Sequence, residues 1–216
     1  MKFAIVLAGC GQHDGSETHE TILTLLSLAQ EGIEWYAFAP DIPQQQVINH
    51  LTEQPQESEN RQVLIESSRL VRGKIKPITE ADVSAFDAII FPGGFGVVSN
   101  LCNWGEKGTD FTMNKDVATF IDHAVFNKKP LGFICIAPMI IPKIFKNAKL
   151  TIGNDNELAE QINSMGSIHV ACEASDVIID KEHNVVSTPA NMVANSIDEV
   201  YIGIHKLVKE LSHMVD

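Results

Sequence analysis

The chain has 216 residues, with 16 Lys and Arg against 28 Asp and Glu, and its net charge is −12. This balance argues against nucleic acid and anionic membranes as partners, because both repel an acidic protein. Hydrophobic residues make up 44% of the chain, and no apolar run approaches the roughly 18 residues of a membrane helix, so we expect one globular domain over residues 1–216.

The cysteines lie far apart and form no C-x-x-C pair; they are Cys10, Cys102, Cys135 and Cys172. This distribution predicts reduced thiols in the cytoplasm, with no disulfide and no metal site. The residues Leu-Ala-Gly before Cys10 resemble the lipid-attachment box of a signal peptide, but the apolar stretch in front of them is too short for one. We expect a buried strand at 3–7 instead.

A glycine-rich loop follows this strand. Gly9, Gly11 and Gly15 resemble a dinucleotide-binding fingerprint, and Asp41 would stand for its ribose-binding acid. The spacing fails because the third glycine of that motif would fall on Asp14, and acidic residues follow where a pyrophosphate would bind. We therefore expect no cofactor.

The helix after this loop starts with two carboxylates. Glu17 is placed to cap the helix, the ordinary role of an acid there, and we also assign it to substrate binding. Glu20 lies one turn deeper and can reach the carboxyl edge of the sheet, where open α/β folds bind ligands. A carboxyl buried at that edge has a raised pKa and can move protons.

Apolar residues then recur at helical spacing, at Ile22, Leu25, Leu26 and Ala29. The pattern predicts a helix that packs this face on a sheet, with Gly32 as its stop. A second strand is expected at 35–39. The polar stretch 44–60 follows it as a long loop, of the kind that often borders functional sites.

A third strand, at 88–91, ends in the residues Pro-Gly-Gly-Phe-Gly. Glycines let the backbone approach a ligand, so we assign Gly93 and Phe95 to substrate binding and the Gly94 amide to an oxyanion hole. The alternative is a tight turn that only needs a positive φ. The stretch 96–112 shows no periodicity and is expected to be irregular.

The strand at 131–134 runs directly into Cys135, and Pro138 suits the first turn of a helix. A helix N-terminus stabilises a thiolate, so we expect the pKa of Cys135 to fall below about 8.5. The geometry is that of a nucleophile elbow, and the Ile136 amide would join that of Gly94 in the oxyanion hole. The alternative is an inert buried cysteine.

A helix at 117–124 and two late strands, at 177–179 and 185–186, continue the alternation of helical and apolar segments. The strands have the composition of strands buried on both sides, which predicts a mainly parallel sheet in a three-layer α/β sandwich. None of the eight histidines stands out as a catalytic partner, and surface or hydrogen-bonded positions are the expectation for them.

Several motifs together resemble the bacterial enhancing-lycopene-biosynthesis family, isoprenoid biosynthesis proteins with an amidotransferase-like domain. This family lies within the class I glutamine amidotransferase-like, or PfpI, superfamily, and the resemblance spans the whole chain. The motifs fall in the segments 9–20, 38–41, 47–51, 92–96 and 132–145.

The resemblance implies a flavodoxin-like fold, a homodimer, Cys135 as nucleophile and Glu20 as its acidic partner. It also implies a weak glyoxalase or deglycase activity on small reactive aldehydes or dicarbonyls, without metal or glutathione. The thiolate would attack glyoxal, Glu20 would move a proton between its carbons, and the amides of Gly94 and Ile136 would hold the oxyanion until glycolate is released.

One departure from the superfamily narrows this expectation. Its proteases and amidotransferases carry a histidine partner, often directly after the cysteine, whereas Ile136 follows Cys135 here. A site without a general acid suits a reactive aldehyde better than an amide. Two alternatives stay open: a redox protein in which Cys135 is oxidised to a sulfinic acid, and a non-catalytic regulator of isoprenoid metabolism.

Overall fold

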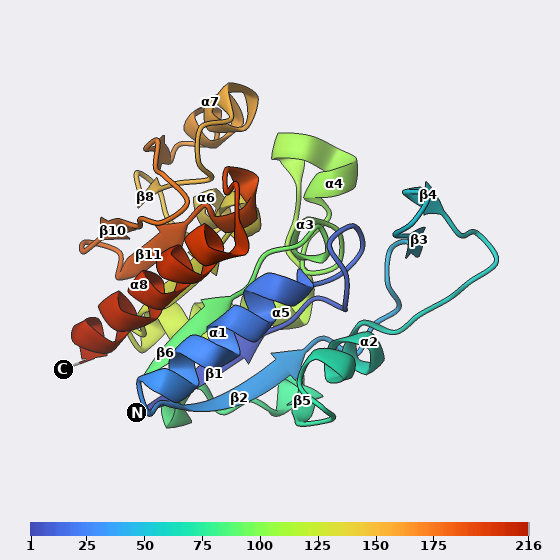
Figure 1. Ribbon diagram of the computed structural model, residues 1–216, viewed down its shortest axis with the longest axis horizontal. Helices are drawn as coiled ribbons and strands as arrows, with labels where there is room; N and C mark the ends of the chain where they lie inside the picture. Colours follow the sequence, from blue (N-terminus) through green and yellow to red (C-terminus); the bar gives the residue numbers. More distant parts are fainter. Residues whose placement is uncertain (216) are drawn as a thin grey trace.

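A computed structural model describes residues 1–215. Its centre is a seven-stranded sheet in the order β10-β11-β7-β6-β1-β2-β5 (Figure 1). Six of these strands run parallel and β10 is antiparallel to β11. The strands are β1 Lys2–Val6, β2 Glu34–Ala39, β5 Ile75–Pro77, β6 Ala88–Phe91, β7 Leu131–Ile134, β10 Ile178–Asp180 and β11 Val185–Thr188.

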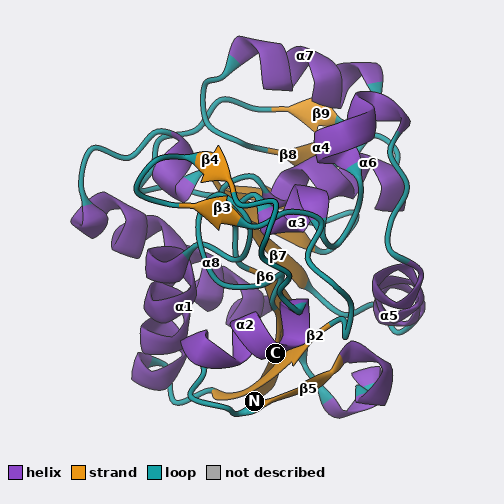
Figure 2. Ribbon diagram, turned by 90° about the vertical axis from the view of Figure 1, so that its right-hand side faces the viewer, coloured by secondary structure: helices purple, strands orange, loops and turns teal. Residues whose placement is uncertain are grey.

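Helices cover both faces of the sheet, and Figure 2 shows α1, α2 and α8 on one side and α5 on the other. The strands β6, β7 and β11 between them are buried along their whole length, as expected for strands covered on both sides. The predicted three-layer, mainly parallel α/β sandwich is confirmed. The longer helices are α1 Thr18–Gln30, α2 Val63–Leu70, α5 Lys115–Phe126, α7 Asn156–Ser164 and α8 Ile197–Val215.

Helix α1 forms where the periodicity predicts it, but the predicted inward face is wrong. Ile22 and Leu26 are each 45% exposed, and the buried face carries Glu20, Thr21, Thr24, Ser27 and Leu28 instead. Short side chains let α1 lie close to the sheet and to α8, and the threonine hydroxyls donate to carbonyls one turn earlier. This register turns Glu20 inward.

Smaller elements occupy the connections. The polar loop 44–60 carries a short antiparallel pair, β3 Ile48–Asn49 and β4 Gln54–Pro55, on an arm that projects from the body (Figure 1). A second small sheet pairs β8 Lys149–Leu150 with β9 Ile168–His169. The stretch expected to be irregular contains two helical turns, α3 Gly96–Ser99 and α4 Trp104–Lys107.

No helix within residues 1–215 has the length and apolar character needed to cross a membrane.

Candidate active site

The site lies at the carboxyl ends of two neighbouring strands. β6 and β7 pair in parallel, with Phe91 opposite Phe133, so the loops that follow them meet at one edge of the sheet. Gly93 and Gly94 follow β6, and Cys135 follows β7. A pocket of about 510 Å³ opens there, with Cys135 in its wall, at the position where parallel sheets bind ligands.

Cys135 sits at a strained turn. Its φ is +61°, in the left-handed region that non-glycine residues seldom occupy and that is often found at functional positions. Its N–H donates to the carbonyl of Thr188 at the end of β11. This is the conformation of a nucleophile elbow.

The helix expected after the elbow is broken into two short pieces. A 3-10 turn, Ala137–Ile140, runs into α6 Ile141–Ile144, and Pro138 and Pro142 occupy their first turns. Two turns this short contain few aligned peptide dipoles, so they stabilise a negative charge on the Cys135 sulfur only weakly. The prediction of a continuous helix behind Cys135 was therefore wrong.

Gly93 leaves room for Cys135 and Glu20 to lie side by side, because it has no side chain. A Cβ at this position would come within 2.4 Å of both the Cys135 Cβ and the Glu20 Oε2. Gly94 adopts φ +98°, and a Cβ there would lie 2.4 Å from the Glu17 nitrogen. Gly93, which the sequence assigned to substrate binding, is not among the residues that line the pocket, whereas Gly94, Phe95 and Ile136 line it.

Glu20 is fully buried beside Cys135. Its Oε2 accepts a hydrogen bond from the Gly93 N–H at 3.1 Å. Its Oε1 accepts from the side-chain amide of Asn191 at 2.9 Å and from the Asn191 N–H at 3.3 Å. The same side-chain amide reaches Glu17 Oε2 at 3.3 Å, and Glu17 caps α1 by accepting from the Glu20 N–H.

Asn191 is the residue of this cluster that sequence reasoning missed. It lies in a 3-10 turn, Ala190–Met192, which follows β11 and begins with Ala190 at φ +44°. In the sequence Asn191 is 171 positions from Glu20 and belongs to none of the motifs. The only available signal was its place just after a predicted strand, at the same sheet edge as Cys135.

Burial controls the acidity of the pair. Burial and then the negative charge of Glu17 raise the pKa of Glu20 to about 7, although hydrogen bonds from Cys135 and Asn191 lower it. Burial also raises the pKa of the Cys135 thiol well above its ordinary value, and the charge of Glu20 adds to this, whereas the amides of Ile136 and Gly94 lower it.

The raised carboxyl pKa agrees with prediction, but the expectation of a low thiol pKa was wrong, because desolvation outweighs the local dipoles. At neutral pH the Cys135 thiol therefore keeps its proton, while Glu20 is about half ionised. Since the pKa of Glu20 lies near 7, its carboxylate can take the proton of the thiol and return it. The amides of Ile136 and Gly94 then face the charged sulfur.

The remaining wall of the pocket is polar and aromatic. Gln12, His13, His19, Phe95 and Met192 line it together with Glu17, Gly94, Cys135, Ile136 and Asn191. Glu20 lies behind Cys135 and is not itself part of the lining. His19 Nδ1 lies 3.8 Å from Glu17 Oε1. Within residues 1–215 no histidine hydrogen-bonds to Cys135, and no three His, Cys, Asp or Glu side chains are grouped to hold a metal ion.

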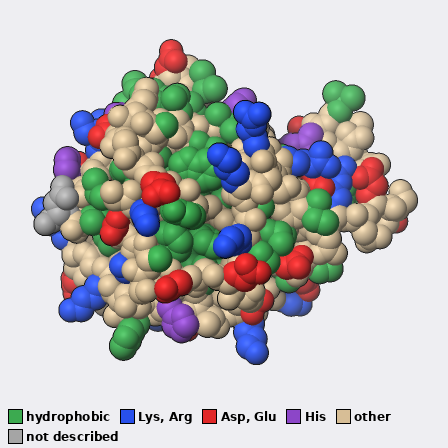
Figure 3. All heavy atoms as spheres, turned by 90° about the horizontal axis from the view of Figure 1, so that it is seen from below, with side chains coloured by type: hydrophobic (Ala, Val, Ile, Leu, Met, Phe, Trp, Pro, Cys, Tyr) green, Lys and Arg blue, Asp and Glu red, His purple; other side chains and the backbone are tan. Residues whose placement is uncertain are grey.

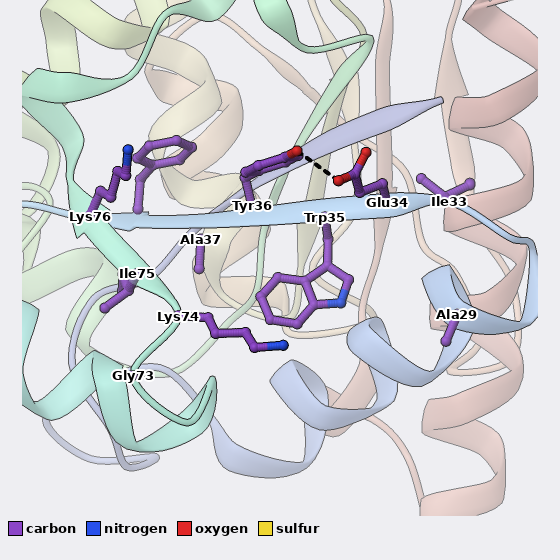
Figure 4. Close-up of a pocket in the computed structure, with 11 residues that line it drawn as sticks. Ala29, Ile33, Glu34, Trp35, Tyr36, Ala37, Gly73, Lys74, Ile75 and Lys76 are labelled. Carbon is purple, nitrogen blue, oxygen red and sulfur yellow. Dashed lines mark hydrogen bonds between the residues drawn. The ribbon is translucent and has the colours of Figure 1, made fainter.

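A larger cavity of about 640 Å³ is lined by residues of β2 and β5, at the β5 edge of the sheet (Figure 4). Trp35 and Lys74 face it from one side of β2, while Tyr36 donates a hydrogen bond to Glu34 on the other side. Seen from below, the molecule shows apolar side chains gathered at the centre of one face, with charged groups around them (Figure 3). The cavity is lined by no cysteine or histidine of the described chain, so the smaller pocket is the candidate active site.

Replacing Asn191 with leucine is expected to raise the pKa of Glu20, because the substitution removes a side-chain hydrogen bond that favours the ionised carboxylate. The pH midpoint of Glu20 ionisation, followed by carbon-13 NMR of its side-chain carboxyl, should rise by about one pH unit. Asn195→Leu, four residues away and outside the pocket, serves as the control. An unchanged midpoint in Asn191→Leu would show that the amide does not tune the pair.

Comparison with known proteins was made by sequence and by structure. None of the protein-family models compared with the chain matches it. The mitochondrial ES1 protein homolog of Rattus norvegicus is 37% identical over 219 residues, which cover 97% of this chain and 82% of the rat protein. The human glutamine amidotransferase-like class 1 domain-containing protein 3, mitochondrial, gives the same identity and coverage.

Among solved structures, an isoprenoid biosynthesis protein with amidotransferase-like domain from Ehrlichia chaffeensis has a TM-score of 0.91 and 31% identity, over 99% of both chains. DJ-1beta of Drosophila melanogaster has a TM-score of 0.57 at 15% identity, over 99% of this chain and 92% of that one; this likeness concerns the fold alone. From the sequence relatives, which match over nearly its whole length, the chain belongs to the family of ES1 and glutamine amidotransferase-like class 1 domain-containing proteins.

Proposed function

We propose that the protein is a cofactor-independent glyoxalase that converts glyoxal to glycolate at Cys135 and uses the same chemistry in deglycation. Glu20 takes the thiol proton, the sulfur attacks one aldehyde carbon, and Glu20 returns the proton to the resulting alkoxide, which gives a hemithioacetal. Glu20 then moves a proton from that carbon to its neighbour, which gives a glycolyl thioester. Water cleaves the thioester, releases glycolate and restores the thiol, so one glyoxal and one water are consumed without any net oxidation.

The observation that carries this proposal is the buried carboxyl of Glu20, whose pKa of about 7 lies next to the thiol. A proton shift between carbons needs a base that is ionised and an acid that is protonated at the same pH, and a group with this pKa provides both forms. The amides of Gly94 and Ile136 point at the position of the sulfur and support the oxyanion role assigned to them. Glu17 and Phe95 in the wall support their assignment to substrate binding.

Purified protein incubated with glyoxal is expected to produce glycolate in amounts equal to the glyoxal consumed. Run in deuterium oxide and followed by proton NMR, the reaction should place deuterium on the glycolate methylene, because Glu20 exchanges its proton with solvent between removal and return. Buffer alone and heat-unfolded protein are the controls. Failure to form glycolate at micromolar enzyme would contradict the proposal.

Oxidation of Cys135 to a sulfinic acid is the weaker reading of the site. Peroxide reacts with the thiolate, and burial together with the charge of Glu20 raises the pKa of this thiol well above its ordinary value. In the proposed aldehyde reaction Glu20 is the base that deprotonates the thiol as the substrate binds, so the high pKa of the thiol does not prevent the attack. We therefore place the redox role second.

The homodimer implied by the family resemblance is part of the proposal. The outward apolar residues Ile22 and Leu26 of α1 support it, because they lie one turn apart on one exposed face. The double variant Ile22→Glu, Leu26→Glu should convert a dimer to a monomer in size-exclusion chromatography with light scattering. Ile65→Glu on α2, which is 59% exposed, should leave the dimer intact. A monomeric wild-type protein would contradict the proposal.

Two broader attributes are part of the proposal, a metabolic link and a cellular location. The Ehrlichia chaffeensis protein is named for isoprenoid biosynthesis, and we propose a link of this chain to the same metabolism. The cytoplasmic location is proposed from the free cysteines; the relatives from rat, human and Danio rerio are named as mitochondrial proteins. Fluorescent tagging of the chain in its own cells would decide the compartment.

A further inference from the structure

Another cavity, of about 390 Å³, lies at the amino ends of β7 and β11. The two strands pair in parallel, so the segments that precede them meet at the sheet edge opposite to the candidate active site. Lys128 and Lys129 precede β7, and His183 and Asn184 precede β11. All four residues line the cavity. Strand pairing thus brings two lysines and a histidine to one place.

The imidazole of His183 is held in position by a buried carboxylate. Asp180 is 5% exposed, and its Oδ2 lies 2.9 Å from His183 Nδ1. The carboxylate also accepts from the N–H groups of Lys149, Glu182 and His183. Burial acts to raise the pKa of Asp180, but the hydrogen bonds from Lys149 and His183 outweigh it and keep the pKa below its ordinary value. Asp180 is therefore ionised at neutral pH and accepts from Nδ1–H.

This arrangement leaves Nε2 as the ring nitrogen of His183 that a ligand can use. Within residues 1–215 the imidazole makes one hydrogen bond, and that bond is through Nδ1. The Phe145 ring packs against the imidazole, with 5.1 Å between the ring centroids. Because Nδ1 faces Asp180, Nε2 is the polar atom that His183 presents to the cavity it lines. In a protonated imidazole Nε2 is a hydrogen-bond donor.

The wall around this imidazole is cationic in an acidic protein. Lys128 and Lys129 bring two ammonium groups to it, and within residues 1–215 neither of them forms an ion pair. Glu182 is the acid of the lining, and it is exposed. The whole chain has a net charge of −12, so two lysines against one glutamate set this cavity apart from the rest of the surface. Its field attracts anions.

We propose that this cavity binds the phosphate group of a small phosphorylated molecule. A phosphate monoester carries about two negative charges and three acceptor oxygens near neutral pH, so it can accept from Lys128, Lys129 and the Nε2 of protonated His183 at once. Hydrogen bonds of this kind, between charged partners, are the strong ones. Asp180 is a positioning residue, because it acts on the ligand only through the imidazole that it fixes.

An apolar part of the lining indicates what the phosphate is attached to. Val125 near the end of α5 and Phe145 after α6 lie in the same wall. They offer contact to an apolar or aromatic body next to the phosphate. We therefore expect phenyl phosphate to bind more tightly than inorganic phosphate. The cavity does not include Cys135, so this inference is independent of the glyoxalase proposal.

The test follows the His183 imidazole by proton–carbon NMR during titration with inorganic phosphate and with phenyl phosphate. The pH is held at about 6.5, where an ordinary histidine is half protonated, and His183→Gln identifies the signal. We expect a saturable shift with a Kd of about 1 mM or below for phosphate, and a Kd severalfold lower for phenyl phosphate. Sodium chloride at the same ionic strength should not reproduce the shift. Equal affinity for the two phosphates would contradict the apolar contact.

Two surface variants should change the Kd in opposite directions. Lys129→Gln should weaken phosphate binding about five- to tenfold, because it removes a charge-assisted donor. Glu182→Gln should strengthen it by about twofold or more, because it removes a repelling carboxylate. Lys115→Gln, exposed at the other end of α5, is the matched control and should leave the Kd unchanged. The proposal is overturned by a shift that chloride reproduces, by no saturation at about 10 mM phosphate, or by a Kd that neither Lys129→Gln nor Glu182→Gln alters.

Discussion

Cys135→Ser is expected to lower glycolate formation from glyoxal by at least about a thousandfold, because no other group of the pocket replaces the sulfur as nucleophile. A serine hydroxyl has a far higher pKa than a thiol, and Glu20, whose pKa is about 7, is too weak a base to ionise it. The fold should survive, since the serine side chain is close in size and can donate its hydroxyl proton to Glu20. The measurement is the initial rate of glycolate release at saturating glyoxal.

The matched control is Cys172→Ser. Cys172 is a half-buried free cysteine outside the pocket, so its removal should leave the rate unchanged. Thermal unfolding of both variants, followed by circular dichroism, would separate lost chemistry from lost structure. If Cys135→Ser kept the wild-type rate in a folded protein, the glyoxal turnover would have to arise elsewhere, and the assignment of Cys135 as nucleophile would be withdrawn.

The second large effect concerns stability. The pKa of Glu20 rises from an ordinary 4.5 to about 7 in the folded protein, so the folded state binds this proton more tightly than the unfolded state. The resulting stabilisation is complete below pH 4.5 and is lost as the pH rises through 7. Each pKa unit corresponds to about 1.4 kcal/mol, so the loss amounts to about 3 kcal/mol between pH 4.5 and 8.

Glu20→Gln cannot titrate, and its free energy of unfolding should therefore lack this component. Urea unfolding at pH 5 and pH 8 should show that the wild type loses about 2–3 kcal/mol more than the variant over this range. The variant should also lose glycolate formation by about a hundredfold or more, since it has no proton acceptor. Glu160→Gln, exposed on α7, should follow the wild type in both measurements. Parallel pH profiles for wild type and Glu20→Gln would show that Glu20 is already ionised at pH 5.

The strands and the elbow could be predicted from the sequence because their signals are local. An unbroken run of apolar residues indicates a strand that is covered on both faces, as in a parallel sheet. The strands β6 Ala88–Phe91 and β7 Leu131–Ile134 have the predicted bounds. The cysteine directly after β7 follows from chain continuity. The sequence could also predict that Gly94 lies near Ile136, because neighbouring parallel strands end at the same edge of the sheet.

The inward face of α1 could not be predicted in the same way. Periodicity reports where apolar residues gather, and it favoured the stripe that includes Ile22 and Leu26, both of which the structure exposes. The opposite face is buried because its short side chains allow close packing, and because Glu20 finds donors in Gly93 and Asn191. Those donors come from distant parts of the chain.

From the amino-acid sequence alone, a thiol could be placed at the carboxyl edge of a parallel α/β sheet, with a glutamate on the first helix able to approach it. How readily the two groups ionise depends on the tertiary structure. Local dipoles predicted an acidic thiol, yet complete burial beside Glu20 raises the pKa of both groups, since desolvation depends on every atom that surrounds the site. The bond from Asn191, 171 positions away, exists for the same reason: folding alone brings it to the carboxylate.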